Sequence, residues 1–154
     1  MNNYQQQLTL NASPAAVYAA LTTAAGLRGW WTQDCDISTG IGDTMRFRFG
    51  AHRKEMRIAR LEPGQAVVWN CVGAHIDVDR FSRKDEWVGT QIVFSLAPHG
   101  TGGTRLDFEH IGLVPALECY DVCNDGWRHY LDSLQRYLDT GTGTPYRPAA
   151  ILAA

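Results

Sequence analysis

The sequence carries little charge and contains no long apolar run. Charged residues make up 19% of the 154 residues and the formal net charge is −2, so we expect neither a basic surface for nucleic acid nor an acidic tail. No apolar stretch approaches the roughly 20 residues that cross a bilayer. The first residues, Met1–Gln5, lack the basic and apolar segments of a signal peptide. We therefore expect a cytoplasmic protein that binds neither nucleic acid nor membranes.

Hydrophobic residues are abundant, at 45% of the chain, and they include five Trp, six Tyr and five Phe. This composition excludes a disordered chain, and the length favours one domain with a core of its own. We place that domain at residues 1–146 and expect a tail of small residues at 147–154. The apolar residues Ala149–Leu152 of this tail, together with exposed sheet edges, leave a homodimer open.

Four cysteines are present, but their spacing does not indicate a metal site. They are Cys35, Cys71, Cys119 and Cys123. Cys119 and Cys123 would share a helix face, but His129 lies at another angle and no second pair has ligand spacing. We expect small buried hydrophobic side chains and no metal. No cofactor is expected either, since the glycine-rich segment 100–103 lacks the Lys-Ser/Thr of a phosphate loop.

The order of hydrophobic patterns predicts an α+β domain. Alternating residues predict strands near 4–11, 43–49, 54–61, 66–72, 90–97 and 104–110. Two short helices are expected at 14–22 and 24–29, the first with Ser13 as its N-cap and Pro14 in its first turn. The charged stretch 77–86 is predicted to be a solvated hairpin loop.

A long amphipathic helix closes the predicted domain. It runs from Pro115 to Thr140, a length of about 37 Å, and ends at Gly141. Its apolar stripe is Ala116, Tyr120, Cys123, Trp127, Tyr130, Leu134 and Leu138. Such a stripe must be covered by the sheet. Because sheets twist, a straight helix does not touch one evenly, which leaves room for a cavity between them.

Large aromatic residues are the candidates for the walls of that cavity. Trp30 and Trp31 could form a lid or stack on a ligand, or they could simply fill the core. His110 alternates along the predicted strand with Leu106 and Phe108, so it is expected to point inward as they do. Its imidazole could then contact a ligand or act as an acid or base; the alternative is a histidine that only forms hydrogen bonds with the backbone. The full candidate set is Trp30, Trp31, Phe47, Phe49, Met56, Trp69, Phe94, Phe108, His110, Tyr120, Cys123 and Trp127.

Arginine is unusually frequent relative to lysine, with twelve Arg and two Lys. Four of the arginines belong to one predicted outer sheet face: Arg46, Arg48, Arg57 and Arg60. They could dock a partner, or they could pair across strands with Asp107 and Glu109. We expect the pairing.

Several segments together resemble a known superfamily. They are 10–22 (LNASPAAVYAALT), Trp30-Trp31, 87–94 (WVGTQIVF), 103–106 (GTRL), 110–113 (HIGL), Gly126-Trp127, Leu131, Leu134 and 141–145 (GTGTP). In order and spacing the chain is similar to the SRPBCC (START-like, helix-grip) superfamily, in the branch of activators of heat-shock protein 90 ATPase. The resemblance covers about residues 4 to 146.

This resemblance implies a curved antiparallel sheet that grips a C-terminal helix, with two short helices after the first strand and an apolar cavity between sheet and helix. The superfamily includes lipid and hormone carriers, polyketide cyclases and a co-chaperone, and it shares no catalytic residue set. Many relatives have a polar residue, often His, where this chain has Cys123 before Asn124-Asp125-Gly126-Trp127. The resemblance therefore implies a less polar cavity at this point.

Three hypotheses about function follow. The first is a cytosolic protein that binds a small apolar molecule, either lipid-like or aromatic and polyketide-like, in the cavity. The second is a protein-interaction module of co-chaperone or regulatory type that contacts a chaperone. The third is an enzyme of cyclase or hydrolase type, for which His110 would be the catalytic candidate.

Overall fold

The computed structural model describes residues 2–148, so the predicted dimer segment Ala149–Leu152 lies outside the described residues. The elements are β1 (Tyr4–Leu10), α1 (Pro14–Thr22), α2 (Ala24–Trp30), β2 (Cys35–Asp36), β3 (Thr44–Phe49), β4 (His52–Glu62), β5 (Ala66–His75), β6 (Gln91–His99), β7 (Gly103–Ile111) and α3 (Tyr120–Thr140).

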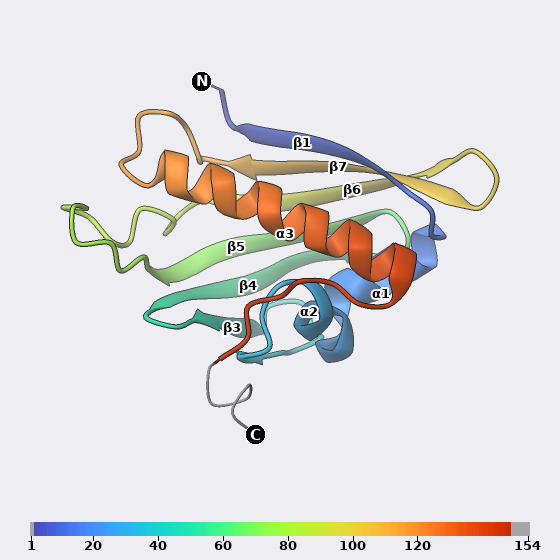
Figure 1. Cartoon of the computed structure of the whole chain (residues 1–154), viewed down its shortest axis with the longest axis horizontal. Coiled ribbons are helices and arrows are strands. Elements are labelled where there is room, and N and C mark those ends of the chain that lie inside the picture. Colours follow the sequence, from blue (N-terminus) through green and yellow to red (C-terminus); the bar gives the residue numbers. More distant parts are fainter. Residues whose placement is uncertain (1, 149–154) are drawn as a thin grey trace.

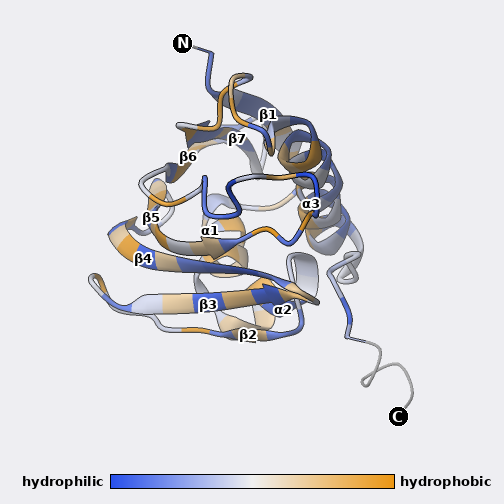
Figure 2. Ribbon diagram, turned by 90° about the vertical axis from the view of Figure 1, so that its left-hand side faces the viewer, coloured by the Kyte–Doolittle hydropathy of each residue, from blue (hydrophilic) through white to orange (hydrophobic). Residues whose placement is uncertain are grey.

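The strands form one seven-stranded antiparallel sheet in the order β1-β7-β6-β5-β4-β3-β2. The chain crosses from α2 to the far edge and then returns strand by strand, so β7 pairs with β1. α3 lies across one face of the sheet, and the end-on view shows the sheet curving around it (Figure 1, Figure 2). The predicted α+β helix-grip fold is confirmed.

Local capping explains where the short helices begin. Ser13 Oγ accepts the N–H of Ala16 at 3.1 Å, and Pro14 occupies the first turn as predicted. Thr23 Oγ1 accepts the N–H of Gly26 at 3.0 Å and begins α2. Gly26 allows α1 and α2 to approach closely, because a Cβ there would lie 2.6 Å from the backbone of Ala20.

The predicted start of the long helix was wrong, since α3 begins at Tyr120 and not at Pro115. The preceding turn is bound instead to the loop between β5 and β6. The Glu86 carboxylate accepts the backbone N–H groups of Glu118 and Cys119, at 3.3 and 3.1 Å. The prediction that the charged stretch 77–86 is simply solvated therefore missed its role in holding the turn that precedes α3.

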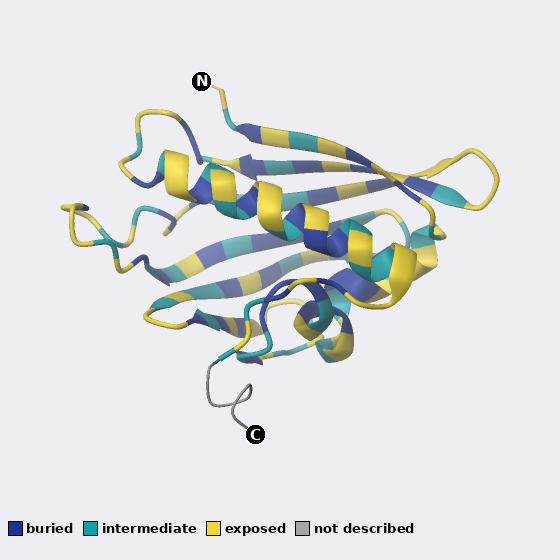
Figure 3. Ribbon diagram, in the orientation of Figure 1, coloured by how far each residue is buried: buried dark blue, intermediate teal, exposed yellow. Residues whose placement is uncertain are grey.

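The core lies between α3 and the concave face of the sheet. Buried and exposed residues alternate along the strands and form a buried stripe on α3 (Figure 3). The buried residues of α3 are Cys123, Trp127, Leu131, Ser133 and Leu134. The helix ends at Gly141, whose φ of 84° is the left-handed conformation that glycine adopts without strain.

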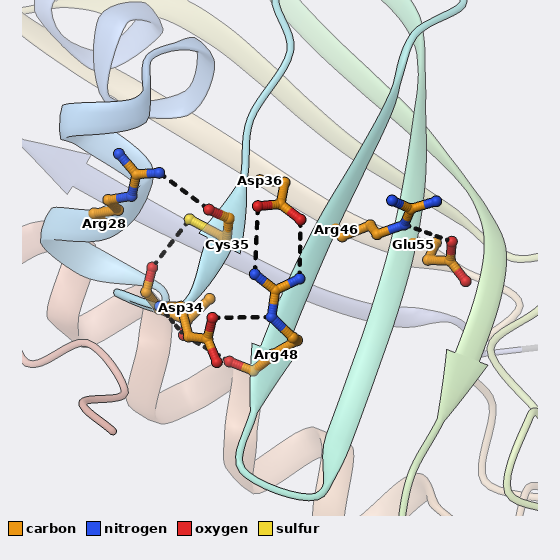
Figure 4. A network of polar contacts seen from close by, with 8 residues as sticks. Arg28, Asp34, Cys35, Asp36, Arg46, Arg48 and Glu55 are labelled. Atoms are coloured by element: carbon orange, nitrogen blue, oxygen red, sulfur yellow. Dashed lines mark hydrogen bonds and ion pairs between the residues drawn. The ribbon is translucent and has the colours of Figure 1, made fainter. Parts of the chain in front are cut away.

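The predicted pairing of the arginines with Asp107 and Glu109 was wrong. β7 lies on the other side of β5 and β6 from the arginine-bearing strands, so the carboxylates of β7 are out of reach. Local carboxylates replace them (Figure 4): Arg46 pairs with Glu55 at 3.2 Å, and Arg48 pairs with Asp34 and Asp36 at 2.9 and 3.0 Å. Arg60 pairs with Glu62. Asp107 and Glu109 instead accept hydrogen bonds from Gln7 and Gln5 of β1.

Candidate ligand pocket

A cavity of about 150 Å³ lies between the first half of α3 and the end of the sheet formed by β3 and β4. It is lined by Trp31, Phe49, His52, Lys54, Ile76, Trp87, Val122, Cys123, Gly126, Trp127 and Tyr130. A buried cavity of this size in another protein holds a benzene molecule. It lies below the range of about 300–1,000 Å³ that is typical of pockets for drug-sized ligands. The cavity is partly open to solvent, and its volume matches a single aromatic ring.

The five tryptophans of the chain form one cluster around this cavity. Trp31 stacks against Trp127 at 5.5 Å between ring centroids, and Trp127 stacks against Trp87 at 5.8 Å. Behind them, Trp30 and Trp69 each stack on Trp31 at 5.7 Å. Three of the rings therefore face the cavity, and the other two support the central ring from the core.

Gly126 leaves open space on the α3 side of the cavity. A Cβ at this position would meet nothing within 4 Å. Glycine inside a helix costs about 1 kcal/mol relative to alanine, and no close contact requires it here. Since Gly126 also lines the cavity, the missing side chain enlarges the space beside Trp127.

A buried hydrogen-bond chain fixes the rings of Trp127 and Trp87. Trp127 Nε1 donates to His110 Nδ1 at 3.0 Å, so the His110 proton must be on Nε2, which lies 2.8 Å from Thr90 Oγ1. Thr90 Oγ1 in turn donates to the carbonyl of Trp87 at 2.6 Å. Finally, the Trp87 indole donates to Cys123 Sγ at 3.1 Å.

This chain of hydrogen bonds, together with burial, determines the protonation state of His110. Its side chain is fully buried and both ring nitrogens have partners, and burial lowers the pKa of His110 to about 3. The imidazole is therefore neutral at physiological pH. His110 lies behind the ring of Trp127 and does not line the cavity, so it positions a wall of the pocket and does not face a ligand.

Lys54 places a cation in this otherwise apolar pocket. Its Nζ lies 4.3 Å from the ring centroid of Trp87 and 4.4 Å from that of Phe49. Burial lowers the pKa of Lys54, because the charged form is separated from water. Register explains this placement: Lys54 pairs with Phe47, a fully buried residue, and paired residues share a face of the sheet.

The thiols near Lys54 differ from one another in their ionisation. Hydrogen bonding to Cys119, together with the charge of Lys54 and the Trp87 indole, lowers the pKa of Cys123. The same hydrogen bond raises the pKa of Cys119. Burial raises the pKa of Cys71 to about 11. Cys123 is therefore the thiol of this group that loses its proton most readily, and it lines the pocket.

The structure brings only part of the predicted residue set to the cavity. Trp31, Phe49, Cys123 and Trp127 line it. The other predicted residues do not line it and belong to the hydrophobic core or to its edge: Trp30, Phe47, Met56, Trp69, Phe94, Phe108, His110 and Tyr120. Among residues 2–148, no three His, Cys, Asp or Glu side chains gather closely enough to hold a metal ion.

Two lining residues could have been found from the sequence. Lys54 lies two and four residues before Met56 and Ile58, so strand alternation predicts that it shares their face of the sheet, and both of them are buried. Tyr130 belongs to the apolar stripe of the long helix. Trp87 and Ile76 gave no such signal, because each comes from the irregular segment between β5 and β6, where no periodicity indicates a direction.

Residues 11–139 match the family model described as Activator of Hsp90 ATPase homolog 1-like protein. The chain belongs to this family. Its structure is similar to the solution structure of the Aha1 dimer from Colwellia psychrerythraea, with 31% identity, a TM-score of 0.77, and coverage of 93% of this chain and 100% of that one.

A second similar structure shares the fold at lower identity. It is a protein from Mesorhizobium loti, with 20% identity, a TM-score of 0.74, and coverage of 90% of this chain and 97% of that one. No curated protein sequence matches the chain. Membership of the Activator of Hsp90 ATPase homolog 1-like family confirms the predicted branch of the helix-grip superfamily. None of the described helices is long and apolar enough to cross a membrane.

Proposed function

We propose that this protein binds a small apolar molecule with one aromatic ring in the cavity beside Gly126. The observation that carries the proposal is the cavity itself, about 150 Å³ in volume and walled by Trp31, Trp87 and Trp127. Stacked aromatic walls favour flat rings. The volume supports a ring-sized molecule over a long acyl chain. Four buried free thiols support a reducing compartment such as the cytoplasm as the place of function.

Thermal unfolding with ring-sized neutral probes tests this proposal. Benzyl alcohol and indole are expected to raise the melting temperature of the wild-type protein, because a ligand that binds only the folded state stabilises it. Decanol serves as the long-chain comparison. The matched variant is Gly126→Leu, which fills the cavity from the helix and should abolish the shift. Equal shifts in both proteins, or no shift in the wild type, would contradict the proposal.

Chaperone regulation is the second candidate, favoured by the family description and by the match to the Aha1 dimer. On this hypothesis the protein contacts an Hsp90-type chaperone, alone or as a homodimer. The protein is expected to form a complex with the purified chaperone and to change the ATPase rate of the chaperone. Light scattering of the free protein measures the homodimer separately. No complex and an unchanged ATPase rate would remove this candidate.

A further inference from the structure

Lys54 differs from the other lysine of the chain in its hydrogen bonding. Lys84 Nζ donates to the carbonyl oxygens of Val78 and Phe81, at 2.9 and 3.0 Å. Within residues 2–148, Lys54 Nζ forms no hydrogen bond or ion pair. Its three N–H donors therefore have no acceptor from the described residues, although the half-buried side chain lies in a pocket lined by several aromatic rings.

The aromatic rings satisfy only part of what this cation needs. The ring faces of Phe49 and Trp87 attract the positive charge of the ammonium, but they supply no lone pair to accept its N–H groups. The thiols of Cys71, Cys119 and Cys123 act on the charge of Lys54. His52 and His110 also lie near it, since the charge of Lys54 lowers the pKa of both imidazoles. Lys54 is half-buried, and a partly desolvated cation without a carboxylate partner is unusual in proteins, because loss of contact with water is costly unless a counter-charge is present.

The position of Lys54 indicates where such a counter-charge would come from. Lys54 lines the same cavity as Trp31 and Trp127, and its Nζ lies over the rings of Phe49 and Trp87, which line the cavity too. A molecule that stacks on these walls would carry its substituent next to the ammonium. A carboxylate on the ring would accept hydrogen bonds from Lys54, and its negative charge would balance the positive charge of the ammonium.

We propose that the ligand is a one-ring aromatic acid whose carboxylate pairs with Lys54. This inference rests on the proposed function, since it assigns the ligand class for the same pocket. It gives Lys54 the role of a specificity residue: the aromatic walls hold the ring, and the ammonium selects the acid over neutral molecules of the same shape.

The test compares two pairs of probes that match in shape and differ in charge. Benzoate is compared with benzamide, and phenylacetate with phenylacetamide, by titration calorimetry and by quenching of tryptophan fluorescence at pH 7. The wild-type protein is expected to prefer each acid by about tenfold or more, as a charge-assisted hydrogen bond in a buried site provides.

Three variants separate the role of Lys54 from general effects of charge. Lys54→Met should remove the preference for acids while leaving the amides bound, and it should fold because it replaces a half-buried, unpaired cation with an apolar side chain of similar length. Lys54→Arg should retain a preference for acids. Arg53→Met makes the same change in net charge on the exposed face of β4 and should leave the preference unchanged.

The outcomes distinguish the two proposals. Acids and amides that bind the wild type equally, or a preference that survives in Lys54→Met, would overturn the assignment of Lys54 while ring binding stands. If none of the four probes binds the wild type, and neutral rings also leave its melting temperature unchanged, the proposed function is overturned together with this inference.

Discussion

Trp127 donates its indole N–H to Nδ1 of His110 over 3.0 Å, and this hydrogen bond ties a wall of the pocket to the end of β7. His110 also reaches Thr90, which holds the backbone of Trp87. One buried imidazole therefore sets the positions of two stacked aromatic rings that line the ligand site. It performs this role only in its neutral form, because Nδ1 must accept the indole proton.

The stability of the protein is expected to fall below pH 6.5 because of His110. Burial lowers its pKa to about 3, whereas the pKa of a histidine in an unfolded chain is about 6.5. As the pH falls below 6.5, the unfolded state takes up a proton that the folded state does not, so the free energy of unfolding decreases until the folded histidine also titrates near pH 3. Between pH 6.5 and 5 the loss is about 2 kcal/mol.

Urea denaturation at pH 7, 6 and 5 measures this effect. His110→Gln keeps a donor and an acceptor but cannot titrate, so its loss of stability over this range should be smaller by about 2 kcal/mol. His129→Gln is the control, because His129 is exposed. The same pH dependence in wild type and His110→Gln would show that His110 does not carry the effect.

Gly126 and Gly26 are expected to respond in opposite ways to alanine. Gly126→Ala adds a methyl group into open space on a helix and should stabilise the fold by about 1 kcal/mol. The same methyl group enters the ligand cavity, so the affinity for ring-sized probes should decrease. Gly26→Ala should destabilise the fold by about 1–3 kcal/mol, because its Cβ would meet the backbone of Ala20 at 2.6 Å.

Urea denaturation and ligand titration of these two variants provide the measurement. A Gly126→Ala protein that is more stable and binds more weakly would indicate that glycine at this position serves the cavity. A more stable variant with unchanged affinity for every probe would contradict this role.

The sequence predicts most of the fold because its signals are local. Met45, Phe47 and Phe49 alternate with arginines, and Ser13-Pro14 begins a helix, so residues close in the chain suffice to identify these elements. The first turn before α3 could not be predicted in this way. Its backbone is held by Glu86, more than 30 residues earlier, and no local pattern encodes that contact.

The pocket was predicted less well than the fold, and His110 and Lys54 show why. The alternation of side chains along a strand correctly predicts that His110 points inward. It does not tell whether an inward side chain ends in a cavity or behind another ring. Lys54 has inward parity too, yet charge usually places lysine at the surface. Only the three-dimensional arrangement shows that its ammonium lies between Phe49 and Trp87.

Cys123 is expected to react with alkylating reagents faster than the other three cysteines. Its pKa is lowered by hydrogen bonding to Cys119 and by Lys54, and the thiolate is the reactive form. Cys35 and Cys71 are buried with raised pKa values, and the pKa of Cys119 is raised by the same interaction that favours ionisation of Cys123. Cys123 also lines the cavity, so a reagent reaches it through the pocket.

Peptide mapping after brief treatment with iodoacetamide at pH 7 identifies the alkylated residue. Benzyl alcohol in the pocket should slow the reaction of Cys123, and Lys54→Met should slow it as well, because it removes a nearby positive charge. Faster labelling of Cys71 than of Cys123 would contradict this assignment of the thiols.

Thr32 is expected to contribute more to stability than the ion pairs that surround Arg48. Thr32 is fully buried; its Oγ1 donates to the carbonyl of Arg48 at 2.7 Å and accepts the N–H of Asp34 at 3.1 Å. Thr32→Val keeps the volume but leaves both backbone groups without this partner, which should cost about 1–3 kcal/mol. The Arg48 ion pairs with Asp34 and Asp36 are partly exposed, so Arg48→Met should cost about 1 kcal/mol or less.

Salt concentration separates the two effects, because it screens exposed charges and leaves a buried neutral hydrogen bond unchanged. Urea denaturation in 0.1 and 1 M salt should show the cost of Arg48→Met shrinking at high salt, while the cost of Thr32→Val stays constant. A larger cost for Arg48→Met than for Thr32→Val in low salt would mean that the network at β2 and β3 is held by charge. The buried hydroxyl of Thr32 would then be secondary, and the edge of the sheet beside Trp31 would depend on ionic strength.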